Sequence, residues 1–293
     1  MKPKISLAMI VYNEEELLPT TLGNIRPWVD EIVITDTGST DATVAIAKSF
    51  GARVVKHTWK KDFSLARNTC LSYVTGDWVL VLDADEFLIG GEELKALVEG
   101  AKAAYQLPIY SPLESQEVLL DYSVRLFPFE HRLKFQGRIH EQILPSLGKC
   151  FPTIQLVTIQ NSPHIWHRGY EKEVMLKKRK ISRNIEIIQE GLELDRDRGF
   201  LHYALGCEYL LAGKGFDSWR AFSKALGLVS SKEVYYEDLN AKLSMARRLQ
   251  FRSLEEGYKM LDLVDKALKI DYWKREIEEK RNILKCINLK EGR

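Results

Sequence analysis

The first 90 residues alternate between short apolar runs and amphipathic segments. Apolar, β-branched runs predict strands at residues 5–11, 31–35, 52–57 and 78–82. Apolar residues at helical spacing fall between them and predict helices at residues 14–24, 41–50 and 63–74. Strand–helix alternation with short turns predicts βαβ units, and therefore an α/β domain with a mostly parallel sheet.

The pattern changes from about Glu92 onward. Residues 92–104 have helical spacing, whereas residues 117–127 and 154–159 have strand character and predict antiparallel additions to the same sheet. After about Tyr170 nearly the whole chain has helical spacing, in segments at 171–190, 200–213, 216–229, 233–251, 254–270 and 272–289. We therefore predict an α/β domain over residues 1–168 and an all-α region over residues 169–293.

One part of the helical region fits a tetratricopeptide repeat (TPR). Leu205-Gly206, Tyr209, Phe222 and Ala225 stand in the relative positions of that repeat, and residues 239–270 look like a second, degenerate copy. Stacked repeats form concave surfaces that suit extended ligands. The region could also mediate a homodimer, and the alternative structure is an ordinary helical bundle.

Composition narrows the class of protein. Hydrophobic residues make up 45% of the 293 residues, and the formal net charge is only +2, which argues against a nucleic-acid binder that relies on phosphate neutralisation. No apolar run approaches the length of a membrane span, and the first residues lack the apolar stretch of a signal peptide. Four widely separated cysteines form no Cys-x-x-Cys, which favours free thiols. We expect a cytoplasmic protein.

The most informative stretch is Val-Leu-Val-Leu-Asp-Ala-Asp-Glu at residues 79–86. Its apolar half predicts a buried strand, so Asp83 and Asp85 would lie just past the carboxyl edge of the sheet, where ligands bind in open α/β folds. Two hard oxygen ligands there suit Mg²⁺ or Mn²⁺ carrying a substrate diphosphate. The alternative is a charged turn after a strand.

The first two strands also end in polar residues. After the first strand, Tyr12 could stack on a base and the following helix could attract phosphate, although Asn13 could simply cap that helix. Asp36 ends the second strand and could accept hydrogen bonds from a base or a ribose. The chain lacks both G-x-G-x-x-G after the first strand and a P-loop, which argues against a dinucleotide or P-loop ATPase site.

Later segments hold further candidates. Arg67, one turn into a helix, could reach a nucleotide or lie on the surface. The polar cluster at residues 137–141 contains His140 and Glu141, which could act in general-base catalysis or have a structural role. His164 and His167 would share a face on a helix but not on a strand. Residues 177–180 are basic and predict a solvated face, of which one or two members could face an anionic leaving group.

Together these residues resemble family 2 glycosyltransferases of the GT-A fold. The matching pieces run in order over about the first 90 residues: Val11-Tyr12-Asn13-Glu14-Glu15, residues 29–41, Arg67-Asn68 and residues 76–86. Residues 138–141 and His167-x-Gly169-Tyr170 look like a branch with TPR-like helices after the catalytic domain, which includes enzymes resembling bacteriocin peptide S-glycosyltransferases.

The resemblance implies a role for each matched residue. Tyr12 would stack on the base, Asp36 and Arg67 would bind the nucleotide, and Asp83 would contact the ribose side. Asp85 would hold Mn²⁺ or Mg²⁺, with His167 as a further ligand, and Glu141 would be the base of an inverting transfer; His140 is the other candidate base. Further nucleotide contacts are expected from Val11, Asn13, Glu14 and Ala84.

Three functions compete at this point. The first is a metal-dependent transfer from a nucleotide sugar, most simply a UDP-sugar, to a peptide, glycan or lipid-linked acceptor. The second is a catalytically silent, GT-A-like scaffold whose helices bind partners. The third, a nucleotidyltransferase, lacks the expected glycine-rich phosphate loop. The acidic and histidine candidates favour the enzyme.

Overall fold

The computed structural model describes residues 2–112, 118–168, 180–231 and 236–250. Contacts divide the chain into two compact units, Met1–Ile187 and Ile188–Arg293, and the division falls inside one helix. The predicted boundary between residues 168 and 169 stays a prediction, because residues 169–179 lie outside the described part.

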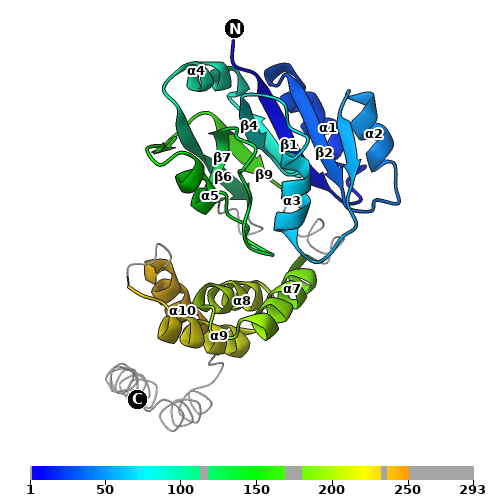
Figure 1. Ribbon diagram of the computed structural model, residues 1–293. Helices are drawn as coiled ribbons and strands as arrows, with labels where there is room; N and C mark the ends of the chain where they lie inside the picture. The colour runs from blue at the N-terminus through cyan, green and yellow to red at the C-terminus, as the bar shows by residue number, and fades with distance from the viewer. Residues whose placement is uncertain (1, 113–117, 169–179, 232–235, 251–293) are drawn as a thin grey trace, which may run out of the picture. The chain divides into compact units, whose positions relative to one another are not determined.

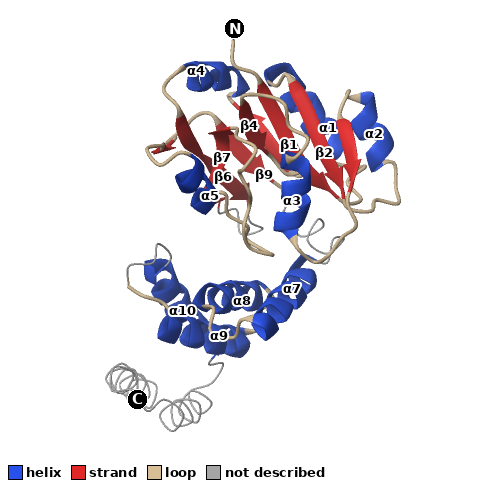
Figure 2. Cartoon of the chain, viewed as in Figure 1, coloured by secondary structure: helices blue, strands red, loops and turns tan. Residues whose placement is uncertain are grey.

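A single mixed sheet forms the centre of the first unit (Figures 1 and 2). Its strand order is β3-β2-β1-β4-β7-β6-β9-β5, with β8 also paired to β6. The strands are β1 Ile5–Val11, β2 Glu31–Asp36, β3 Arg53–Lys56, β4 Trp78–Val81, β5 Glu86–Ile89, β6 Ala103–Pro112, β7 Val118–Pro128, β8 Gln155–Thr158 and β9 His164–His167. The first four strands are mutually parallel, and the α/β prediction is confirmed.

Both faces of the parallel part are covered by helices, which is why its strands read as continuous apolar runs. Ile5, Leu7 and Met9 of β1 pack with helices α1 and α2 on one face, while Ala8 packs with α3 on the other. The helices of this unit are α1 Leu18–Ile25, α2 Thr43–Ser49, α3 Phe63–Leu71, α4 Leu94–Glu99 and α5 Leu144–Cys150.

The later strands depart from the expectation. β7 joins β4 in antiparallel orientation as predicted, but β8 is parallel to its neighbour β6. The sequence pattern had missed β6, which begins at Ala103 inside the segment expected to be helical; α4 already ends at Glu99. Proline is rare inside strands, so Pro108 argues against a strand in this segment. It is tolerated because it lies between the part of β6 that pairs with β8 and the part that pairs with β9.

Helix α1 begins later than predicted, and Asn13 does not cap it. The cap position is Leu17, and Asn13 lies at φ 53° in the loop before it. The Asn13 side-chain oxygen accepts a hydrogen bond from the Thr40 amide at 2.8 Å. Asn13 therefore ties the loop after β1 to the loop after β2.

The described part of the second unit is helical, as predicted. Helix α7 (Lys180–Leu194) enters it and is followed by α8 Gly199–Leu211, α9 Gly215–Leu228 and α10 Tyr236–Gln250. Phe222 and Ala225 belong to its apolar core, and Gly206 lies against the Phe222 ring. The helices expected at 254–270 and 272–289 fall outside the described residues, as does the part of the helix expected at 171–190 before Lys180.

Two expectations from composition can be compared with the described residues. Among the described residues, Cys70, Cys150 and Cys207 form no disulfide, and Cys286 is not described. Among the helices that the structure describes, none has the length and hydropathy needed to cross a bilayer.

Candidate active site

The loop Asp83-Ala84-Asp85 follows β4 after one residue, Leu82, and hydrogen bonds to its backbone hold it in place. The Thr21 hydroxyl of α1 donates to the Ala84 carbonyl at 2.7 Å. The Asp83 amide donates to a Glu86 carboxylate oxygen at 2.9 Å, and the Arg168 amide donates to the Asp85 carbonyl at 2.9 Å. The two aspartates are thus presented at the carboxyl edge of the sheet by a loop that is fixed at each residue.

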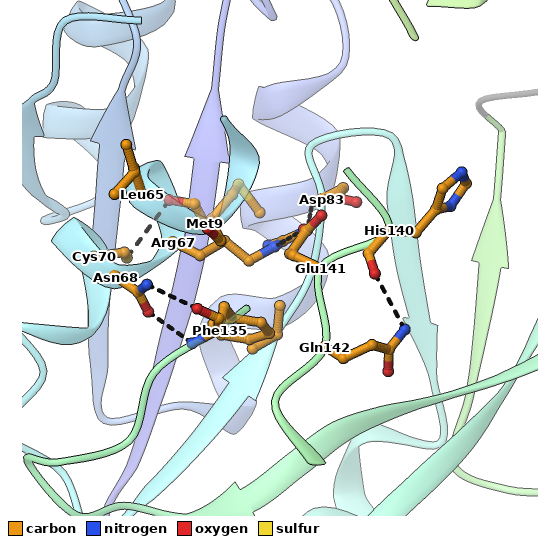
Figure 3. A network of polar contacts seen from close by, with 12 residues as sticks. Met9, Leu65, Arg67, Asn68, Cys70, Asp83, Phe135, His140, Glu141 and Gln142 are labelled. Atoms are coloured by element: carbon orange, nitrogen blue, oxygen red, sulfur yellow. Dashed lines mark hydrogen bonds and ion pairs between the residues drawn. The ribbon is translucent and has the colours of Figure 1, made fainter. Parts of the chain in front are cut away.

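Arg67 of α3 binds two carboxylates at once. Its Nη2 donates to Asp83 Oδ1 at 2.9 Å and its Nε donates to Glu141 Oε1, so the guanidinium lies between the two acids (Figure 3). Burial lowers the pKa of Arg67, but Asp83 and Glu141 outweigh this and raise it. Burial acts to raise the Asp83 pKa, and the nearby arginines reverse the effect and hold it below its ordinary value.

Glu141 reaches Arg67 through a tight turn between Gln136 and Gln142. These two residues exchange backbone hydrogen bonds of 3.0 and 2.9 Å, and Gly137 supplies a backbone conformation at φ 104° that favours glycine. Next to Arg67, the side-chain amide of Asn68 accepts from the Phe135 backbone N–H at 2.7 Å and donates to the Phe135 carbonyl at 3.0 Å. Helix α3 therefore fixes both Arg67 and the segment that carries Glu141.

The other candidate in this turn is oriented differently. Figure 3 shows the His140 ring pointing away from Arg67 and Glu141, while the His140 carbonyl accepts from Gln142 at 3.4 Å. Of the two candidate bases, Glu141 is the one inside the charged cluster.

Asp85 lies deeper than Asp83, with side chains 6% and 33% exposed respectively. Lys180, the first residue of α7, donates to Asp85 Oδ2, and His167 Nε2 lies 3.8 Å from Asp85 Oδ1. The strand register places His167 beside this loop, because Glu86 and His167 are partners in the β5–β9 pair. Because both histidines are on strand β9 at odd spacing, His164 faces the other side, against Tyr110.

The other ring nitrogen of His167 has its own partner. Nδ1 lies 3.2 Å from the hydroxyl of Ser111, a buried residue of β6. Burial lowers the pKa of His167, but Asp85 and Glu86 outweigh it and raise the pKa above its ordinary value. The imidazole is therefore oriented with Nε2 toward Asp85.

A second buried arginine supports the same loop. Arg125 of β7 donates to Glu86 Oε1 at 2.7 Å and to the Val81 carbonyl at 3.4 Å. Burial raises the Glu86 pKa, and Arg125 only partly opposes that effect. Since Glu86 also accepts from the Asp83 amide, Arg125 helps to position Asp83 through Glu86.

The loops after β1 and β2 are joined to each other. Val11 and Asp36 are partners in the sheet, and the Val11 carbonyl accepts from both the amide and the hydroxyl of Thr37 at 3.0 Å. Asp36 is only 4% exposed, and its carboxylate accepts from the Ser39 amide at 3.1 Å. Glu14 contributes its amide to Thr43 at 2.7 Å, whereas the Tyr12 side chain is 55% exposed.

Comparison with known proteins now decides the family. Residues 6–154 match the profile described as Glycosyl transferase family 2. The chain belongs to glycosyl transferase family 2.

Two curated relatives extend this match. A TPR repeat-containing protein of Synechococcus elongatus is 34% identical over 208 residues, covering 69% of this chain and 51% of that protein. The SPbeta prophage-derived glycosyltransferase SunS of Bacillus subtilis is 30% identical over 222 residues, covering 72% of this chain and 50% of that protein. The chain spans about half the length of these curated relatives.

A solved structure shares the fold. The crystal structure of S. aureus TarS 1–349 in complex with UDP-GlcNAc superposes with a TM-score of 0.51 at 16% identity, covering 84% of this chain and 88% of that one. At this identity the likeness concerns the fold, and it agrees with the expected GT-A architecture.

The family 2 chain brings most predicted site residues to one edge of its sheet. Arg67, Asp83 and Glu141 form one ion-paired group, and Asp85 and His167 form a second group beside it. Val11, Asn13, Glu14 and Asp36 shape the neighbouring loops, and Tyr12 is an exposed aromatic residue in the first of them. Their individual contacts with a nucleotide stay predictions.

Three residues of this site escaped sequence reasoning or were left open by it. Arg125 and Ser111 lie in strands without a motif, and only the pairing of β6, β7 and β9 brings them here. Lys180 was one of four basic residues predicted mainly to face solvent, and nothing in its spacing singled it out.

The residues around Asp85 fit the divalent cation that the family resemblance implies. Two ligands of one ion with bonds of about 2.1 Å lie roughly 3.0–4.2 Å apart, depending on their angle. The separation of 3.8 Å between Asp85 Oδ1 and His167 Nε2 falls in that range. Within the described residues no set of three or more acidic, histidine or cysteine side chains forms a complete cage, so further ligands would have to come from substrate or water.

Proposed function

We propose that this chain carries the catalytic domain of an inverting, metal-dependent glycosyltransferase that uses a nucleotide sugar, with UDP as the expected nucleotide. The observation that carries the proposal is the Asp83-Ala84-Asp85 loop at the carboxyl edge of a family 2 domain, with Arg67 on its first aspartate and His167 beside its second. UDP is further supported by the TarS complex, which shares the fold and holds UDP-GlcNAc.

The nucleotide would lie across the ends of β1, β2 and β4. Tyr12 is exposed enough to stack on the base, and Asp83 keeps one third of its side chain accessible for the ribose. Asp36, Asn13 and Glu14 would act largely by shaping the two joined loops, since the hydrogen bonds described above lie within these loops or join them to α2. Arg67 would hold Asp83 in place and contribute positive charge.

Asp85 and His167 would hold Mn²⁺ or Mg²⁺. Such an ion, when bound, neutralises negative charge that develops on the leaving diphosphate. Ser111 contributes by holding the imidazole so that Nε2 faces Asp85. The loop backbone contributes by keeping Asp85 in position before the substrate arrives.

Glu141 is the proposed general base. The acceptor atom would attack C1 of the sugar from the face opposite the diphosphate, the C1–O bond would break with its electron pair leaving on the diphosphate, and the acceptor proton would pass to Glu141. Because Oε1 is held by Arg67, Oε2 is the oxygen that would receive the proton. The Asn68 contacts with Phe135 would keep this carboxylate within reach.

The acceptor is expected to be a peptide, a glycan or a lipid-linked molecule, and the helical region is the proposed place for acceptor or partner binding, or for a homodimer. Its support is the TPR-like contact of Gly206 with Phe222 and the TPR repeat-containing relative.

The test is a panel of nucleotide sugars with Mn²⁺, read by thermal stabilisation and by hydrolysis without acceptor. A ligand at about one hundred times its Kd adds roughly 2.7 kcal/mol of stability. Binding with slow, Mn²⁺-dependent hydrolysis supports an enzyme. Binding without hydrolysis or transfer would instead indicate the silent scaffold, and no binding of any nucleotide sugar would contradict the proposal.

A further inference from the structure

Lys180 is placed on Asp85 by the packing of its helix. Its side chain is 19% exposed and its ammonium donates to the nearly buried Asp85 carboxylate. Two further contacts dock the first turns of α7 on the same unit: Glu186 pairs with Lys61 at 2.6 Å, and the Arg183 guanidinium lies 5.0 Å from the Phe63 ring centre. The position of Lys180 is therefore part of the fold of the first unit.

The carboxylates of the site are paired with two kinds of cation, arginine and lysine. In the described part of the chain, Arg67 is paired with Asp83 and Glu141, and Arg125 is paired with Glu86. Asp85, the proposed metal ligand, is paired with a lysine instead. A guanidinium makes fixed, forked contacts, whereas an ammonium is a compact charge on a flexible stem that can exchange between anions.

We propose that Lys180 and the divalent cation compete for Asp85, and that Lys180 binds the donor diphosphate once the cation has taken its place. The inference rests on the proposed function. A buried carboxylate without a cation destabilises the folded protein, so Lys180 neutralises Asp85 while the site is empty. Two cations on one carboxylate repel each other, and the diphosphate brings the nearest new negative charge. Lys180 is thus a positioning residue in the empty site and a diphosphate ligand in the loaded one.

The test uses the full chain and two separate titrations. Mn²⁺ alone is titrated into the protein, and UDP is titrated at saturating Mn²⁺, both by calorimetry. In Lys180→Met, Mn²⁺ alone should bind more tightly, and UDP should bind about tenfold more weakly because a charge-assisted hydrogen bond is lost. Lys48→Met is the control, since it removes an exposed lysine in the last turn of α2 that takes no part in docking α7, and it should leave both affinities unchanged.

A second variant guards against misfolding of the first. Lys180→Arg keeps the charge but holds Asp85 with a forked donor, so Mn²⁺ alone should bind more weakly than to the wild type. If both Lys180 variants bind Mn²⁺ and UDP like the wild type, the role of Lys180 is overturned while the proposed function stands. If the wild type binds neither Mn²⁺ nor UDP, the proposed function fails and the Lys180 proposal fails with it.

Discussion

The sheet edge of the first unit and the core cluster of the second unit bury opposite kinds of side chain. At the sheet edge of the first unit, Asp83, Asp85, Glu86 and Glu141 are held by two arginines and a lysine. In the second unit the core cluster is made of apolar residues such as Trp219, Phe222 and Leu239, and Gly206 packs closely against Phe222.

Buried apolar side chains and buried charged side chains therefore have different roles in this protein. Packing apolar side chains stabilises a fold with little dependence on conditions, whereas buried ion pairs add little net stability and are strongly destabilising when one partner is removed. A cluster of buried charge therefore indicates a site that is kept for ligands. Changes at the charged sheet edge should alter nucleotide binding together with stability, and changes in the apolar core of the second unit should alter stability without altering nucleotide binding.

The largest effect is expected from Arg67→Met. The change leaves two carboxylates, Asp83 and Glu141, without their cation. Loss of one partner of a buried pair costs about 3–5 kcal/mol, and we expect about 3 kcal/mol because Asp83 can be rehydrated. UDP binding should be lost as well. Urea denaturation and UDP titration measure the two quantities.

The matched control is Arg132→Met, which removes a surface arginine paired with Glu130 at 2.9 Å. Exposed pairs contribute about 0–1 kcal/mol, so this variant should stay near the wild type in both measurements. Equal losses in the two variants would contradict the distinction between buried and exposed charge.

Glu141→Gln tests the chemistry within the first unit. The amide can still accept from Arg67 but cannot take a proton, so kcat should fall by about two to four powers of ten. UDP affinity should stay close to that of the wild type, whereas His167→Ala should weaken Mn²⁺ and UDP binding together. Steady-state kinetics and calorimetry separate the two. The opposite pattern would mean that the two roles are exchanged.

Gly206→Ala tests the apolar core of the second unit. An added Cβ would lie 2.4 Å from the Phe222 ring, so the ring must shift. Overpacking of this kind costs about 1–3 kcal/mol. Hydrogen exchange of the α8 and α9 amides should report the loss, with UDP affinity unchanged.

Gly227→Ala in α9 is its control. Its added Cβ meets open space, and replacing a helical glycine by alanine gains roughly 0.5–1 kcal/mol. If Gly206→Ala lowered UDP affinity, the separation of the two units by function would be wrong.

The smallest effect is a pair of opposite pH dependences. Burial lowers the pKa of His202, so its contribution to stability is present above its ordinary pKa of about 6.5 and is lost as pH falls below it. The pKa of His167 is raised, so its contribution is present below about 6.5 and is lost as pH rises through the folded value. Comparing each His→Gln variant with the wild type, in EDTA, should show the two opposite slopes.

Much of the fold could be predicted from local patterns. Predicted and observed strands agree within one residue at each end where buried apolar runs are bounded by turns, as in β1, β2 and β4. β5 begins with Glu86, β9 begins and ends with a histidine, and β6 contains prolines, so none gives a strand signal of its own. They exist because they pair with one another, and such pairing is not visible in a local pattern.

The site residues also divide into those that a local pattern could place and those that only long-range contacts could place. Asp83, Asp85 and Asp36 could be placed because each lies at or just past the carboxyl end of a predicted strand. The ion pairs of Arg67 with Glu141 and of Lys180 with Asp85 join residues 74 and 95 positions apart, and they depend on the turn at 136–142 and on the docking of α7. Spacing along the chain carries no information about such contacts.

The proposed function depends above all on Asp85 holding a divalent cation that binds a nucleoside diphosphate at the edge of this sheet. The most direct measurement is calorimetric titration of UDP into wild type, Asp85→Asn and the exposed control Asp121→Asn, each in Mn²⁺ and in EDTA. We expect Mn²⁺-dependent binding by the wild type and Asp121→Asn and none by Asp85→Asn. Equal UDP affinity in Mn²⁺ and EDTA, or wild-type affinity in Asp85→Asn, would contradict it.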